Sequence, residues 1–250
     1  MTATLAASGW LLPLADRPRA EVELYCFPHG GGGASVYRAW ADHLPPFVAP
    51  YALALPGREH RAELPPATEA EPLVTAFTAA LRGSTRPCAL FGHSSGSLFA
   101  TRVALALAEA GIPPVLLGVS AFPAAHLTGR ALDVRARFRS DLEGTVLSLD
   151  AQAAAAFEDP AIRTAALSAV AADMILHSSY GESFTGNIGC PVSTFCGTSD
   201  PIITPPEMAE WAHFTTAPPT VHTYPGGHFY LREERANVVA DLTWDLAAAL

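Results

Sequence analysis

The chain has 250 residues, half of them apolar, and carries a formal net charge of −9 at pH 7. This length predicts one large domain with an insertion rather than two small domains, and the acidic balance argues against general nucleic-acid binding. No apolar run approaches the length of a membrane span, and the N-terminus lacks the basic segment of a signal peptide. We therefore expect a cytoplasmic protein without membrane contact.

The four cysteines, Cys26, Cys88, Cys190 and Cys196, are scattered without C-x-x-C spacing. We expect buried thiols in a reducing compartment rather than zinc ligands or disulfides. The histidines likewise show no spacing that indicates a metal site, and we interpret most of them, including His126 and His177, as surface or lid residues.

In the first part of the chain, alternating apolar patterns predict a short edge strand at 10–14, a strand at 21–27, a helical segment at 34–44, a strand at 47–55 and a helix at 68–81. A glycine-rich loop follows the second of these strands. Thr68 and Glu71 have the spacing of a capping box, which predicts Thr68 as the N-cap of the helix.

Residues 87–111 predict a short apolar strand, a sharp turn and a long helix rich in Ala and Leu. The turn, Gly92-His-Ser-Ser-Gly96, matches G-x-S-x-G, a pattern that places a serine hydroxyl above the sheet at a strand-to-helix turn. A side chain at either glycine would collide with the neighbouring strand or helix. The helix N-terminus behind Ser94 favours negative charge developing on an oxygen. A serine in a tight turn with no catalytic role is the alternative interpretation.

After a strand at 115–120 the alternation of strands and helices lapses over residues 125–187. This segment is too long for a connecting loop and has helical patterns at 151–157 and 161–176, so we expect an inserted helical lid. Alternation then resumes with a strand at 191–196, a helix at 206–214, a strand at 220–224 and a terminal helix from 231.

Strands that alternate with helices predict an α/β fold, with a mostly parallel central sheet covered by helices on both faces. We expect residues 1–124 and 188–250 to form this core and residues 125–187 to form the lid.

A serine nucleophile in this architecture needs an acid and a histidine, in that order, on loops after later strands. Asp200 follows the strand at 191–196, and His228 follows the strand at 220–224. His228 would take the proton from Ser94, and Asp200 would orient the imidazole. Asp173 and Asp150 are rivals for the acid, but both fall in the predicted lid.

The glycine loop Gly30–Gly33 has two interpretations. Its backbone N–H groups, together with that of Ser95, can form an oxyanion hole. A dinucleotide fingerprint is the other interpretation, but it requires Gly or Ala at a third position where this chain has Ser35 or Val36.

With these residues in place, the chain resembles type II (stand-alone, editing) thioesterases of polyketide and non-ribosomal peptide synthesis, within the α/β-hydrolase superfamily. The resemblance covers nearly the whole chain. It rests on Cys26-Phe-Pro-His-Gly-Gly31, Trp40, Leu55-Pro-Gly-Arg-Glu59 with Arg61, Gly92-His-Ser-Ser-Gly96, Ala172-Asp173 with Tyr180, Gly197-x-x-Asp200, Trp211 and Gly226-Gly-His-Phe229.

The resemblance implies Ser94, Asp200 and His228 as a catalytic triad, and the N–H groups of Gly30 and Ser95 as the oxyanion hole. It implies acyl groups on the phosphopantetheine thiol of an acyl or peptidyl carrier protein as the substrate, with no metal and no cofactor. We expect a monomer. The residues expected to contact the substrate are His29, Gly31, His93, Arg58 and Phe229.

Members of this family often have Met where this chain has Ser95, Ala where it has Gly30 and Arg where it has Ala171. The first two positions contribute backbone N–H groups, so the chemistry should be retained. The lid is otherwise the least similar part of the chain.

Carrier proteins are typically acidic, and so is this chain, so docking would need a local basic patch. Four arginines crowd the beginning of the predicted lid: Arg130, Arg135, Arg137 and Arg139. Our hypothesis is that they receive the carrier or its phosphate. A solvated helix face is the competing interpretation.

The same machinery also suits a carboxylesterase, or a cyclase or acyltransferase in which a substrate hydroxyl or amine replaces water. A non-catalytic binding protein that keeps the fold is an interpretation from another class. The complete Ser-Asp-His set argues against it.

Overall fold

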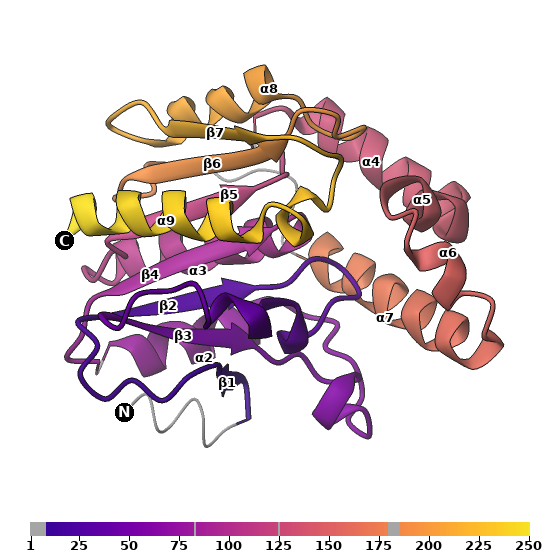
Figure 1. Ribbon diagram of the computed structural model, residues 1–250, viewed down its shortest axis with the longest axis horizontal. Coiled ribbons are helices and arrows are strands. Elements are labelled where there is room, and N and C mark those ends of the chain that lie inside the picture. Colours follow the sequence, from indigo (N-terminus) through magenta and orange to yellow (C-terminus); the bar gives the residue numbers. More distant parts are fainter. Residues whose placement is uncertain (1–8, 83, 125, 180–185) are drawn as a thin grey trace.

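The computed structural model describes residues 9–82, 84–124, 126–179 and 186–250, without the side chains of residues 128 and 130–132 (Figure 1). The seven-stranded sheet has the order β1-β3-β2-β4-β5-β6-β7. Its strands are β1 (Leu11–Pro13), β2 (Val22–Phe27), β3 (Val48–Leu53), β4 (Cys88–His93), β5 (Leu116–Ser120), β6 (Val192–Gly197) and β7 (Thr220–Tyr224). Every pairing is parallel except that of β1 with β3, so the α/β prediction and the short edge strand are confirmed.

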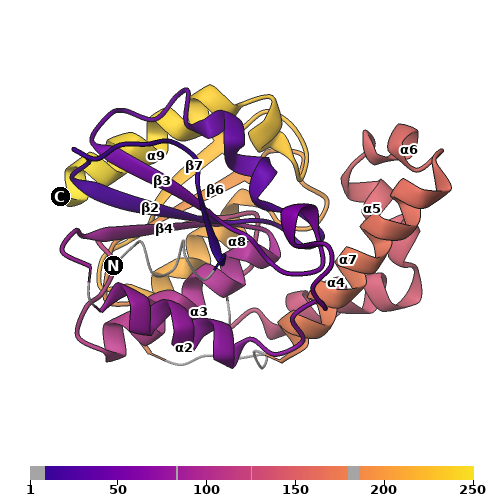
Figure 2. The ribbon, with the colours of Figure 1, turned by 90° about the horizontal axis from the view of Figure 1, so that it is seen from below.

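Helices cover both faces of this sheet. Helices α2 (Glu71–Leu81) and α3 (Ser95–Glu109) lie on one face, and α9 (Arg235–Ala249) lies on the other beside the 3₁₀ helix η1 (Ala34–Trp40) (Figure 2). The remaining core helices are short: η2 (Glu59–Arg61), α8 (Pro205–Ala209), η3 (Glu210–Phe214) and η4 (Tyr230–Arg232). None of the described helices combines the length and the apolar character needed to cross a membrane.

The core is closed by large apolar side chains that meet at the sheet. Trp40 of η1 packs on Phe91 of β4 with 4.8 Å between ring centroids, and Phe91 packs in turn on Phe195 of β6 at 5.5 Å. All four cysteines are buried and unbridged, as predicted. Burial raises the pKa of the Cys88 thiol to about 12, so it stays protonated and unreactive.

The helix predicted at 68–81 begins at Glu71, and the predicted capping box of Thr68 is wrong. Pro72 explains the difference. A helix capped by Thr68 would place Pro72 at the fourth helical position, where its missing N–H is needed for an intrahelical bond. Beginning at Glu71 places Pro72 within the first turn instead, where no such bond is required. The Ala70 N–H is satisfied by the Ser179 hydroxyl at 3.0 Å.

Four helices beyond the carboxyl ends of the strands form the segment that we call the lid, residues 126–179 (Figure 1). They are α4 (Thr128–Ser140), α5 (Leu142–Leu149), α6 (Ala153–Ala156) and α7 (Pro160–Ser178). Helices were predicted only over its second half, whereas α4 and α5 make the first half helical too. The predicted domain boundaries, 1–124 with 188–250 and 125–187, stay a prediction.

The first turn of α3 lies against the end of β2, and glycine makes this approach feasible. A Cβ atom at Gly96 would lie 2.2 Å from the Phe27 carbonyl oxygen and 2.5 Å from that of Pro28. A Cβ atom at Gly92 would lie 2.3 Å from the Gly96 carbonyl oxygen. The predicted collisions at both glycines are therefore confirmed, and backbone atoms cannot move aside as a flexible side chain would.

We predict that Gly96→Ala lowers the free energy of unfolding by about 3 kcal/mol, because the helix must separate from the strand to admit the methyl group. Gly129→Ala is the control, since among the described residues no atom outside its own stretch of α4 lies within 4 Å of its Cβ position. Urea unfolding of both variants measures the difference. Equal stabilities would show that the contact between α3 and β2 is not constrained as described.

Lowering the pH should destabilise the fold through His177, which is buried on α7. Burial lowers its pKa to about 4, an effect that Asp173 opposes and that Arg135 and Arg58 reinforce. A histidine with a depressed folded-state pKa takes up its proton more readily when unfolded, where its pKa is about 6.5. The loss of folding free energy caused by the neutral, buried His177 is absent above about pH 7 and grows as the pH falls from about 6.5 toward 4.

We expect this residue to account for about 2 kcal/mol of the stability lost between pH 7.5 and pH 5. In His177→Gln the loss over that interval should be smaller by this amount, whereas the exposed-site variant His60→Gln should lose as much as the wild type. Urea unfolding at both pH values gives the comparison. An unchanged loss in His177→Gln would contradict it.

Candidate active site

Ser94 lies at the turn between β4 and α3 with a left-handed backbone, φ 53° and ψ −128°. This conformation is strained for a residue that carries a side chain, and its neighbours hold it in place. The Ser94 N–H donates to the Ser120 carbonyl at 2.7 Å, and the Ser94 carbonyl accepts from the Ser97 N–H at 2.9 Å. The turn therefore projects the Ser94 hydroxyl beyond the carboxyl edge of the sheet.

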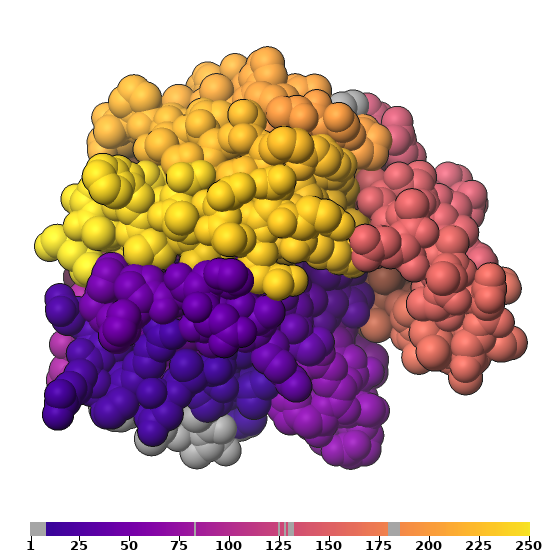
Figure 3. Space-filling model, in the orientation of Figure 1, coloured from indigo at the N-terminus to yellow at the C-terminus, as the bar shows by residue number. Residues whose placement is uncertain are grey.

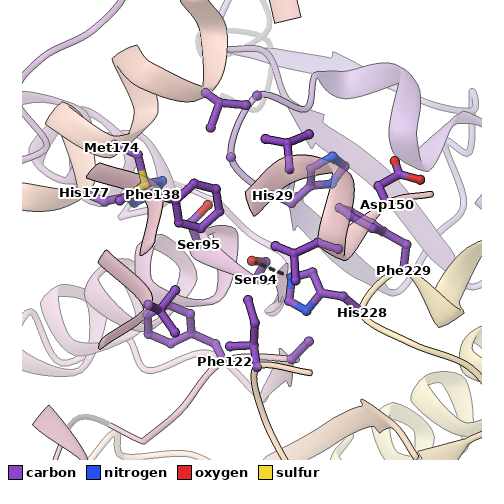
Figure 4. A pocket seen from close by; sticks show the side chains of 18 of the residues that line it. His29, Ser94, Ser95, Phe122, Phe138, Asp150, Met174, His177, His228 and Phe229 are labelled. Atoms are coloured by element: carbon purple, nitrogen blue, oxygen red, sulfur yellow. Dashed lines mark hydrogen bonds between the residues drawn. The ribbon is translucent and has the colours of Figure 1, made fainter. Parts of the chain in front are cut away.

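Ser94, His228 and Asp200 form a continuous hydrogen-bonded chain. His228 Nε2 is 3.0 Å from Ser94 Oγ, the bond drawn in Figure 4, and His228 Nδ1 is 2.8 Å from Asp200 Oδ2. His228 is 1% exposed, and the other Asp200 oxygen accepts from the Ile202 N–H at 2.8 Å. The geometry fits a neutral imidazole that donates to Asp200 and accepts from Ser94.

The loops after β6 and β7 bring the acid and the histidine together. A Cβ atom at Gly197 would lie 2.3 Å from the Gly227 carbonyl, so glycine allows the two loops to touch. The Ser199 N–H then donates to the Gly226 carbonyl at 2.9 Å. The rival acids are engaged elsewhere, since Asp173 is paired with Arg58 and Asp150 with Arg232.

Two further histidine rings surround His228, and both are held neutral. Burial, together with the positive charge of Arg232, lowers the pKa of His29 to about 3. Burial likewise lowers the pKa of His93, whose Nδ1 lies 2.8 Å from Ser120 Oγ. The rings of His93 and His228 are 5.2 Å apart. His93 therefore supports His228 from within the core and does not line the pocket, contrary to its predicted contact with substrate.

The glycine loop lies directly against the serine turn. A Cβ atom at Gly30 would lie 3.2 Å from Ser95 Oγ. Neither the Gly30 N–H nor the Ser95 N–H has a hydrogen-bond acceptor within the part of the chain that the structure describes. Both residues line the same cavity as Ser94, so the two amides are available to an oxygen bound there.

This cavity, of about 220 Å³, opens above Ser94 between the core and the lid (Figure 4). Its lid wall is apolar and consists mainly of Phe138, Val146, Leu149, Phe157, Val170 and Met174. His29, Gly31 and Phe229 line it from the core, and their predicted contact with substrate stays a prediction. The sequence did not single out the lid residues, because their apolar spacing cannot be distinguished from ordinary helix packing.

Arg58 was predicted to contact substrate, and the structure corrects this. Its guanidinium lies behind the glycine loop, with its two terminal nitrogens 2.7 and 2.6 Å from the Asp173 carboxylate oxygens. It is not among the residues that line the cavity.

The predicted arginine patch is not formed as one surface. Arg135 lines the cavity and donates to the His177 carbonyl at 3.3 Å. Arg137 and Arg139 are exposed on α4, and the Arg130 side chain lies outside the described residues, as does Tyr180. Arg135 and Arg137 are two positions apart on α4, so their side chains point in widely different directions.

The interpretation of His126 as a surface residue holds, but it has close neighbours. Among the described residues, His126, Glu210 and His213 have potential metal-ligand atoms within 4.8 Å of one another. His126 Nε2 bonds Glu210 Oε2 at 3.1 Å, and His213 Nδ1 lies 3.5 Å from the same oxygen. These contacts account for the cluster without an ion. It lies outside the cavity that contains Ser94.

Comparison with known proteins agrees with this geometry. The sequence model of the thioesterase domain family matches residues 22–244. The thioesterase TesA of Mycobacterium marinum is 32% identical over 236 residues, which cover 91% of this chain and 92% of that protein.

Two solved structures resemble this chain in both sequence and fold. The type II thioesterase BorB from the borrelidin biosynthetic cluster has a TM-score of 0.75 at 32% identity, over 95% of this chain and 97% of BorB. RedJ, the thioesterase of the prodiginine pathway in Streptomyces coelicolor, has a TM-score of 0.77 at 31% identity, over 96% of this chain and 95% of RedJ. The family match, the shared α/β-hydrolase architecture and these identities show that the chain belongs to the thioesterase family and is a hydrolase of thioesters.

Proposed function

We propose that this chain is a stand-alone type II thioesterase that releases acyl groups from the phosphopantetheine thiol of acyl or peptidyl carrier proteins. The observation that carries the proposal is the hydrogen-bonded chain Ser94–His228–Asp200 at the base of an apolar cavity. The relatives support the biosynthetic setting, since BorB belongs to a borrelidin cluster and RedJ to a prodiginine pathway. Removal of aberrant chains from a polyketide or non-ribosomal peptide synthase is the role that fits.

In the proposed reaction, Ser94 Oγ attacks the thioester carbonyl carbon while His228 Nε2 takes its proton. The carbonyl oxygen becomes an oxyanion that accepts hydrogen bonds from the Gly30 and Ser95 amides. The carbon–sulfur bond then breaks, and His228 returns the proton to the departing thiol. An acyl ester on Ser94 remains.

Water completes the cycle. His228 takes a proton from the water molecule, the hydroxide attacks the acyl ester, and the proton passes to Ser94 as the free acid leaves. Asp200 keeps the proton of His228 on Nδ1 throughout and stabilises the imidazolium that forms twice in each cycle. The apolar lid wall holds the acyl chain and limits the access of bulk water.

Carrier docking remains a proposal, and of the four arginines predicted for it we retain Arg137 and Arg139. Both are exposed, and Arg137 lies along a surface groove beside Pro201 and Ile202, the residues that follow Asp200. A carrier that delivered its arm over this groove would place an acidic surface near the two guanidinium groups. The chain is proposed to act as a monomer in the cytoplasm, with no cofactor.

The first test compares acyl release from a phosphopantetheinylated carrier with release from small acyl thioesters and oxygen esters, in wild type and Ser94→Ala. We expect carrier-bound thioesters to be preferred, and kcat/KM to fall by at least about 10⁴-fold in Ser94→Ala. A preference for oxygen esters would indicate a carboxylesterase. Loss of substrate without free acid would indicate a cyclase or acyltransferase. Failure of Ser94 to react with a fluorophosphonate probe would support a non-catalytic protein.

The docking proposal predicts a KM effect limited to carrier substrates. Arg137→Glu/Arg139→Glu should raise KM for an acyl-carrier protein about tenfold and leave KM for a small thioester unchanged, because only the carrier spans the lid surface. Arg19→Glu/Arg82→Glu is the control, with the same charge change at exposed sites near the opposite edge of the sheet. Equal effects on both substrates, or an equal effect of the control pair, would contradict docking at α4.

A further inference from the structure

The carboxylate of Asp173 connects the lid to the glycine loop. Asp173 lies on α7 with its side chain 3% exposed, and its Oδ2 accepts from the Gly31 backbone N–H at 2.7 Å. The same oxygen accepts from Arg58 Nη1 at 2.7 Å, and Oδ1 accepts from Arg58 Nη2 at 2.6 Å. One buried carboxylate thus holds a core arginine and a loop amide together, and hydrogen bonds to a charged group are stronger than neutral ones.

The loop that contains η2 holds the other side of the same glycines. Arg58 Nη1 also donates to the Gly32 carbonyl at 2.9 Å. Glu59 accepts from the Ala34 N–H at 2.9 Å and the Ser35 N–H at 3.1 Å, at the beginning of η1. The glycine loop therefore has a charged partner at each end, and of the charged partners named here Asp173 is the one that belongs to the lid.

The position of Gly30 follows from that of Gly31. The Gly31 N–H belongs to the peptide unit that follows Gly30, so its bond to Asp173 restrains the orientation of that peptide plane. Gly31 has φ +80°, and a Cβ atom there would lie 2.5 Å from Val170 Cγ2 on α7. The helix therefore packs directly on the loop through Val170.

We propose that Asp173 is a positioning residue that couples docking of α7 to assembly of the oxyanion hole. With α7 docked, the Gly30 amide is directed at the space above Ser94; with α7 displaced, the glycine loop loses the partner of Gly31 and that direction. The lid would then act on the transition state as well as on the acyl chain. This inference rests on the proposed hydrolysis at Ser94 and on the role of the Gly30 amide in it.

The test uses Arg58→Met/Asp173→Leu, because removing one partner alone would leave a buried charge unpaired and risk unfolding. The double variant removes both charges and the acceptor of Gly31 while keeping apolar volume. A small acyl thioester is the substrate, so carrier docking plays no part. A boronic acid with the same acyl chain reports the oxyanion hole, since its tetrahedral adduct with Ser94 places an oxygen there. The free acid product reports ground-state binding.

We expect kcat to fall about 10²-fold, boronate affinity to fall in parallel, and KM and product affinity to change less than threefold. Asp150→Leu/Arg232→Met is the matched control, since it removes a lid–core ion pair of the same kind, at 2.8 and 2.6 Å, that does not touch the glycine loop. In the control variant, any loss of boronate affinity should be accompanied by an equal loss of product affinity.

A folded Arg58→Met/Asp173→Leu variant with wild-type kcat and boronate affinity would overturn the coupling. So would a parallel loss of boronate and product affinity, which would indicate a merely loosened lid. If instead the wild type hydrolysed no thioester, the proposed function would fail, which is a separate outcome.

Discussion

The site depends on one close backbone contact, that of the first turn of α3 with the end of β2. At Gly96 the helix approaches the Phe27 carbonyl so closely that even a methyl group would have to displace it. The same contact holds Ser94 in its left-handed conformation and places Ser95 beside Gly30. The nucleophile and the Ser95 amide are therefore positioned by main-chain packing, whereas the glycine loop also depends on the Asp173 carboxylate bonded to the Gly31 N–H.

The lid and the core contribute different kinds of groups to the cavity above this contact. The lid supplies most of the apolar side chains of the cavity wall, whereas the core supplies the backbone amides and the imidazole rings near Ser94. His29 and His93 are neutral because burial disfavours their protonated forms. His228, alone among these three imidazoles, has a carboxylate partner, so it is the one that gains stabilisation when it becomes charged.

Two bidentate ion pairs join the lid to the core on different sides of the cavity. Arg58 and Asp173 lie behind the glycine loop, and Arg232 and Asp150 lie near the rim, where Arg232 also stacks on Phe229 at 4.5 Å. The second pair is the more exposed, with Arg232 at 33%. On the face shown in Figure 3, the lid meets the core beside the C-terminal part of the chain, which is coloured yellow. The exposed pair is the weaker attachment because solvent and salt screen it.

Sequence reasoning predicted the parts of the site that depend on strand order. Asp200 and His228 follow parallel strands, and the carboxyl ends of such strands share one edge, so their meeting with Ser94 followed from topology. The beginning of α2 was mispredicted because a local capping pattern was weighed without Pro72. The lid wall of the cavity could not be predicted, because apolar positions on α4, α5 and α7 become a binding surface only when three helices converge. Arg58 and Asp173 are 115 positions apart, and no local pattern pairs them.

The placement of the arginines shows why the four arginines that lie close together in the lid sequence did not predict one basic surface patch. The chain has no lysine, so every long cationic side chain is a guanidinium, which can satisfy several carbonyl oxygens at once. Arg61 donates to the carbonyls of Ala54 and Gly9, and Arg17 to that of Val48 at 3.0 Å. Arg135 likewise donates to a carbonyl of α7. An arginine whose guanidinium is bonded to backbone carbonyls contributes little to a surface patch, whatever its neighbours in the sequence. The surface potential therefore depends on which arginines stay exposed, such as Arg137 and Arg139 on α4 and Arg19 and Arg82 elsewhere, rather than on how many the sequence contains.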